Sequence, residues 1–185
     1  MPTLRSPAAI RYHYSWASHR GGQIAMTIMV KKIPDAWVAI GLAAHFVAKR
    51  EPFSRFPAGD LIRTLSNQVH RENYLFALDI VANAARPARV IGYFGWALYD
   101  EAVAERFAAT GVPPPDELTT GGDVIWILTA AAENRGAFFA LAKATRALYP
   151  AHRVMAIRRK AGGRRVTLDQ SRARVQARKI STSAG

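Results

Sequence analysis

The sequence predicts an α/β (α+β) fold, with a mixed, mostly antiparallel sheet and helices on both faces of that sheet. Segments with apolar residues at helical spacing alternate with short aromatic and β-branched runs, and proline and glycine separate them. Half of the 185 residues are apolar and a fifth are charged, which is typical of a globular chain. A chain of this length is expected to form one domain with a substantial core.

Two helices are predicted first. Pro34-Asp35 is typical of a helix start, and apolar residues follow it at helical spacing from Trp37 to Val47. Pro52 and Pro57 interrupt the helical pattern, because proline disfavours helical geometry in the residue before it. A second helix is therefore predicted from residue 58 to residue 70.

The later elements alternate between strands and helices. In order, they are predicted as strands 73–81 and 89–98 in a hairpin, a helix 100–110, a strand 124–131, a helix 136–149, and a terminal hairpin of 153–159 with 164–168. Gly111 suits the end of the 100–110 helix, because glycine adopts the left-handed conformation of a helix C-cap readily. We expect residues 1–36 to be a poorly ordered N-terminal extension, 37–169 to form the domain, and 170–185 to be a basic tail.

The net charge of +13 lies at the two ends of the chain. Residues 37–150 hold 11 basic and 11 acidic side chains, whereas residues 151–185 hold ten basic side chains and Asp169. Such charge predicts an acidic partner, namely nucleic acid, an anionic membrane or an acidic protein. A solvated basic tail with no dedicated partner is the alternative. The chain from Arg158 onward has no aromatic residue to stack on bases, so nucleic acid is the weaker prediction.

Several classes of chemistry are excluded by composition and spacing. The chain has no cysteine, which excludes disulfides and thiolate chemistry and favours a cytoplasmic location. Its five histidines do not have metal-ligand spacing, so no metal site is expected, and no phosphate-binding loop or nucleophile elbow occurs. No apolar run approaches the length of a membrane-spanning helix. His45 is a tentative general base on the first predicted helix, and a structural role is its alternative.

The stretch from Thr120 to Pro150 is the strongest candidate for a binding site. A Gly-Gly-Asp turn leads into an apolar strand, and the polar break 133–136 then opens a helix. A strand that ends at an exposed helix N-terminus presents backbone N–H groups to a phosphate or a polarised carbonyl. An ordinary strand–helix unit without a ligand is the alternative.

On this element order the chain resembles the RTX toxin-activating lysine acyltransferases, the hemolysin-activating family, over about residues 39–169. The residues that carry the resemblance are Ile40-Gly41, Phe56-Pro57, Tyr93 to Leu98 with Trp96-Ala97, Gly122-Asp123, Trp126-Ile127, Gly136-Ala137, Tyr149-Pro150 and Ala156-Ile157-Arg158. The resemblance implies a fold like that of the Gcn5-related N-acetyltransferases. It also implies transfer of a fatty acyl group from acyl carrier protein, through its phosphopantetheine thioester, to an internal lysine of a protoxin. Acyl carrier protein is acidic, so it would suit the basic charge.

The chain departs from the family at its two catalytic positions. The position of the family's histidine matches Phe53, and that of its aspartate matches Thr129. Neither side chain can act as a general base at neutral pH. The resemblance places Trp126, Asn134, Arg135 and Gly136 at the acyl donor, with no permanently bound cofactor.

Three hypotheses follow. The first is a divergent acyltransferase that acts on a protein or peptide lysine, with His45 as a substitute base. The second is a catalytically inactive relative that binds acyl carrier protein or lipid, and the third is a basic-tailed nucleic-acid or membrane-surface binder. Whether the chain is an enzyme stays open at this point, as does its oligomeric state, a homodimer included.

Overall fold

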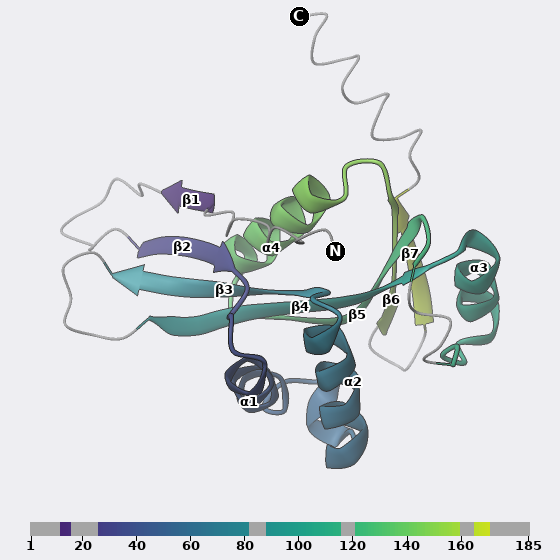
Figure 1. The fold of residues 1–185 in the computed structure, drawn as a ribbon, viewed down its shortest axis with the longest axis horizontal. Helices are drawn as coiled ribbons and strands as arrows, with labels where there is room; N and C mark the ends of the chain where they lie inside the picture. Colours follow the sequence, from purple (N-terminus) through teal and green to yellow (C-terminus); the bar gives the residue numbers. More distant parts are fainter. Residues whose placement is uncertain (1–11, 16–25, 82–87, 116–120, 160–164, 171–185) are drawn as a thin grey trace, which may run out of the picture. The chain divides into compact units, whose positions relative to one another are not determined.

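A computed structural model describes residues 12–15, 26–81, 88–115, 121–159 and 165–170 (Figure 1). The chain divides into two compact units, the first of Met1–Phe94 with Ala131–Arg146 and the second of Gly95–Ala130 with Ala147–Gly185. The described strands are hydrogen-bonded in chain order as one seven-stranded sheet, and β4 and β5 contribute residues to both units. The strands are β1 (Tyr12–Ser15), β2 (Met26–Lys31), β3 (Tyr74–Val81), β4 (Arg89–Tyr99), β5 (Val124–Ala132), β6 (Arg153–Arg159) and β7 (Arg165–Gln170).

In the first unit, β2 pairs antiparallel with both β1 and β3. Its Ile28 and Val30 are buried, whereas the alternate residues Thr27 and Met29 are half-buried. β1 and β2 correct our expectation that residues 1–36 form a poorly ordered extension, because 12–15 and 26–31 are paired strands of the sheet and β2 also pairs with β3. Residues 1–11 and 16–25 of that segment lie outside the described residues.

Helices α1 (Ala36–Val47) and α2 (Ala58–His70) cover one face of the first unit's sheet (Figure 1). Asp35 caps α1, since its carboxylate accepts a hydrogen bond from the backbone N–H of Val38 at 2.9 Å. One core cluster joins the two helices to alternate residues of β3, including Tyr74 and Phe76. The buried apolar face of each helix therefore fixes it to the sheet.

Helix α4 (Arg135–Leu148) covers the opposite face of the same unit. Phe94 of β4 meets Phe138 of α4 edge to face, with ring centroids 5.2 Å apart. A Cβ added to Gly92 would lie 2.8 Å from the Leu141 side chain, so glycine at this position lets α4 approach the sheet closely. Helices on both faces of a mixed, mostly antiparallel sheet confirm the predicted α+β class, and the architecture is consistent with a Gcn5-related N-acetyltransferase-like fold.

In the second unit, β5 pairs parallel with β6, and β6 pairs antiparallel with β7. Helix α3 (Glu101–Thr110) ends at Gly111, which is left-handed with φ 69°. Its Phe107 stacks on Trp126 of β5, with ring centroids 4.5 Å apart. This contact lies in a second core cluster that also includes Met155 of β6.

The predicted elements from the first helix to the terminal hairpin are confirmed, with boundaries that differ by one or two residues. The turn of the 73–98 hairpin includes residues 82–87, which lie outside the described residues, as does most of the predicted 170–185 tail. The division into two units is a finding that the sequence did not predict.

Candidate functional site

The start of α4 is a capped and exposed helix N-terminus. The Asn134 side-chain oxygen accepts a hydrogen bond from the backbone N–H of Ala137 at 2.8 Å, and its carbonyl accepts one from Phe138 at 3.2 Å. Asn134 and Arg135 are exposed, and Gly136 is half-buried. Because N–H groups in a first helical turn have no intrahelical acceptor, this turn can hold an anion or a polarised carbonyl.

Gly136 has a packing role in this turn. A Cβ at Gly136 would lie 3.2 Å from the Asn134 side-chain oxygen and 3.3 Å from the end of Ile28 on β2. Any larger residue would press on the cap and on the sheet together. The structure therefore brings the predicted donor residues Asn134, Arg135 and Gly136 into one turn, and it explains the glycine without a ligand.

Next to this turn lies a charged cluster that sequence reasoning missed, the Glu133 cluster, made of Arg50, Asp79, Arg89 and Glu133. Arg89 donates to both carboxylate oxygens of Glu133, at 2.8 and 2.7 Å, and Arg50 donates to the same carboxylate at 3.0 Å. Arg89 also lies 3.9 Å from the buried Asp79. The four residues come from separate parts of the chain, so no local spacing could have revealed them. The formal charges of the four residues balance.

His45 lies on the exposed face of α1. Its Nε2 is 2.8 Å from the ammonium nitrogen of Lys49, and an ammonium group can only donate, so Nε2 is the acceptor. That hydrogen bond occupies the lone pair that a general base would use.

Phe53, in contrast, is buried in the short 3₁₀ turn Phe53–Arg55. It packs with the core that covers the buried face of α1, and its ring meets Phe56 at 5.6 Å between centroids. The structure does not bring His45 to the position of Phe53, because His45 lies on the exposed face of α1 whereas Phe53 packs with the core on the buried face.

Trp126 and Thr129 both lie in β5 of the second unit. Trp126 is almost fully buried with its ring against Phe107, so its surroundings are those of a core residue. Thr129 is also buried, and a separation of three residues along a strand places it on the other face from Trp126. The parallel ladder between β5 and β6 ends at Ile127 and Ala156, close to Thr129, although both strands continue.

The turn before β5 explains a second motif of the resemblance. Gly122 has φ +117°, and a Cβ at this position would overlap the backbone carbonyl of Tyr99. The next residue, Asp123, accepts a hydrogen bond at its carbonyl from the backbone N–H of Arg153 at 3.0 Å. Gly122-Asp123 therefore joins β5 to β4 and β6, which is a structural role.

Arg153 is the centre of a second charged cluster. Its guanidinium donates to Asp169 at 2.6 and 2.9 Å, and it forms ion pairs with Glu101 at 3.0 Å and Glu105 at 2.6 Å. The hydrogen bonds to Asp169, followed by those to Glu105, raise the pKa of the Arg153 guanidinium. These contacts tie α3 to β6 and β7 and leave no proton-transfer role for Arg153.

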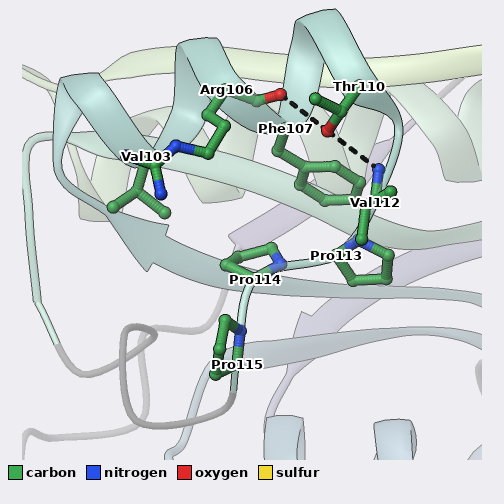
Figure 2. A pocket seen from close by; sticks show the side chains of 8 residues that line it. All are labelled: Val103, Arg106, Phe107, Thr110, Val112, Pro113, Pro114 and Pro115. Atoms are coloured by element: carbon green, nitrogen blue, oxygen red, sulfur yellow. Dashed lines mark hydrogen bonds between the residues drawn. The ribbon is translucent and has the colours of Figure 1, made fainter.

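An apolar groove of about 310 Å³ lies between α3 and the extended segment that follows it (Figure 2). Its lining residues are Val103, Arg106, Phe107, Thr110, Val112, Pro113, Pro114 and Pro115. The Thr110 hydroxyl donates to the Arg106 carbonyl at 2.9 Å and accepts from Val112 at 3.1 Å. Because proline has no N–H donor, the groove offers a ligand mainly hydrocarbon contact.

No protein-family model matches the chain, and no curated protein matches it. Within the described ranges, no group of three or more His, Cys, Asp and Glu side chains could hold a metal ion. Among those same residues, none of the helices has both the length and the apolar character to cross a membrane.

Proposed function

We propose that this chain transfers an acyl group from acyl carrier protein to the side-chain amine of a protein lysine. The observation that carries the proposal is the first turn of α4. It follows β5 directly, is capped by Asn134, and opens a helix that has three basic residues and no acidic one. Helix N-termini favour anions. The donor's prosthetic group is joined to its carrier by an anionic phosphodiester, so the first turn of α4 is suited to bind that group.

The α+β fold supports this proposal, since it has the element order that the resemblance implies. β5 and β6 pair in parallel within a mostly antiparallel sheet. Parallel strands need a crossover connection between them, and α4 lies between β5 and β6 in the element order. The net charge of +13 gives the acidic carrier a favourable electrostatic approach.

In the proposed reaction, the neutral lysine nitrogen attacks the thioester carbonyl carbon. A C–N bond forms, the C–S bond breaks, and the carrier leaves as its thiol after taking up the proton that the amine loses. The backbone N–H groups of Arg135 and Gly136 bind the phosphodiester of the donor's arm and so help to orient the thioester. The enzyme then contributes chiefly orientation, which supplies on the order of several kcal/mol of barrier lowering.

The test is a mass measurement. The full chain is incubated with an acylated bacterial carrier protein and with candidate lysine-bearing proteins, and each acceptor is then analysed by intact mass and peptide mapping. The proposal expects a mass gain equal to one acyl group on a lysine, absent when the chain is omitted. Carrier binding without any acyl gain, for every acceptor tried, would contradict the enzyme proposal.

A second candidate is a catalytically inactive binding module for acyl carrier protein or lipid. The observation that favours it is the burial of Phe53 and Thr129 at the family's two catalytic positions, together with the hydrogen bond that occupies His45. For this candidate, carrier binding persists while the carrier keeps its acyl group through the whole incubation. Loss of the thioester at a rate above that of the chain-free control would contradict it.

A further inference from the structure

The outer face of α4 carries a phenylalanine, Phe139, that packs little against the described part of the chain. The side chains that pack on the sheet are small or aliphatic, and they are Ala137, Ala140, Leu141, Ala144 and Thr145. Phe139 lies on the other side of the helix and is 65% exposed. Phe138, at 45% exposed, lies on the flank of the helix, where it contacts Phe94.

Phe139 makes one recorded ring contact, with Phe138, at 5.9 Å between centroids. It therefore buries little apolar area in the described part of the chain. Phenylalanine, like the other aromatic residues, is enriched at protein interfaces relative to the rest of the surface.

Three cations share this face with Phe139. At helical spacing, Arg135 lies one turn before Phe139, and Lys143 and Arg146 lie one and two turns after it. The helix has no acidic residue, and Glu133, just before it, is held by Arg50 and Arg89. Partial burial lowers the pKa of Arg146, so one of the cations is already partly desolvated.

We propose that the outer face of α4, defined by Arg135, Phe139, Lys143 and Arg146, docks an acidic protein surface with an apolar centre. Resting on the proposed function, we take this partner to be the acyl carrier protein itself. An apolar anchor ringed by charged residues is the arrangement of a protein interface with a hot spot. Binding to a membrane surface by a helix of this kind needs a wide apolar face, whereas the apolar residues of α4 largely face the sheet.

The position of this face suits the proposed reaction. Phe139 lies five residues after Asn134, which is about 7.5 Å along the helix axis at roughly 1.5 Å per residue. A carrier that docks on Phe139 would therefore hold its prosthetic arm beside the first turn of α4. The docking surface and the donor turn then lie on the same helix and share Arg135.

The experiment measures binding, without any need for acyl transfer. The apo form of a bacterial acyl carrier protein, which lacks the prosthetic arm, is titrated against the full chain by calorimetry, and the wild type is compared with Phe139→Glu and Lys143→Glu. The control is Phe56→Glu, because Phe56 is 43% exposed but lies outside α4. Phosphatidylglycerol vesicles serve as a second probe.

We expect Phe139→Glu to weaken carrier binding about tenfold or more and Lys143→Glu to weaken it less, while Phe56→Glu leaves it unchanged. Equal binding by wild type and Phe139→Glu would overturn the docking surface, yet it would leave the proposed function standing if acyl transfer is still observed. Absence of carrier binding together with absence of transfer would overturn both. Vesicle binding that depends on Phe139, without carrier binding, would overturn the choice of a protein partner.

Discussion

Helices α3 and α4 both carry aromatic residues, and they use them in opposite ways. α3 buries Phe107 against Trp126, with the two rings 4.5 Å apart and nearly parallel at 22°. α4 buries alanine, leucine and threonine and leaves Phe139 exposed. Each helix covers a sheet face in its own unit. The two helices therefore differ in where their aromatic side chains lie, buried against the sheet in α3 and exposed in α4.

The contrast shows that an aromatic residue on an amphipathic helix is not necessarily a core residue. In α4 the small buried residues lie against Gly92, where a Cβ would come within 2.8 Å of Leu141, and this close approach leaves no space for a phenylalanine. In α3 the stacked pair itself fills the space between helix and sheet. We therefore assign the α3 aromatics to stability and Phe139 to binding.

Phe107→Ala would test the α3 side of the comparison with the largest effect. The change removes the ring that stacks on Trp126 and creates a cavity, and we expect it to lower the free energy of unfolding by about 3–4 kcal/mol. Urea denaturation of the full chain measures this. A change below about 1 kcal/mol would mean that the contact contributes little to the folded state, contrary to our assignment.

Gly122→Ala is expected to cost about 2–3 kcal/mol, because the residue has φ +117° and its new Cβ would overlap the Tyr99 carbonyl. Tyr99 in turn contacts Phe107, so the change strains the support of the same aromatic group. Gly121→Ala is the matched control, since nothing lies within 4 Å of its Cβ. Thermal unfolding of both variants checks the difference, and equal melting temperatures would contradict the structural role of Gly122.

Asn134→Ala addresses the α4 side and should lower the free energy of unfolding by about 1 kcal/mol, because it removes the cap from the Ala137 N–H. Asn134→Asp keeps the cap, so we expect stability to be retained. The added negative charge should nevertheless weaken binding of an anionic donor at this turn. Denaturation and carrier titration of both variants separate the two effects, and unchanged carrier binding in Asn134→Asp would contradict the placement of the donor.

Phe139→Ala is expected to change the free energy of unfolding by less than about 0.5 kcal/mol, the smallest effect of the series, because the ring is mostly exposed. A loss comparable with that of Phe107→Ala would show that Phe139 has a core role and would erase the contrast between the two helices. The same urea denaturation, on the two variants side by side, gives the comparison.

The sequence predicted most helix boundaries because local signals mark them. Asp35 caps α1 through its own side chain, and Gly111 ends α3 in the left-handed conformation. It did not predict β2, whose residues from Met26 to Val30 are nearly all apolar and become a strand through pairing with β3.

The candidate site was predictable in part. The polar break before α4 marked its first turn. The adjacent Phe138 and Phe139 point in different directions on a helix, so the sequence could have predicted that one of the two rings is exposed. The Glu133 cluster could not be predicted, because Arg50 and Arg89 reach Glu133 from 83 and 44 residues away along the chain. The sequence alone shows Phe53 and Thr129 at the positions where the resemblance expects catalytic residues, but the hydrogen bond between His45 and Lys49 required the structure.

The most direct test of the central claim is hydrogen–deuterium exchange of the full chain with and without acylated carrier protein. If α4 receives the donor, peptides that cover 133–143 should gain protection on addition of the carrier, while peptides of α3 stay unchanged. Protection confined to α3, or no protection anywhere despite saturating carrier, would contradict the account.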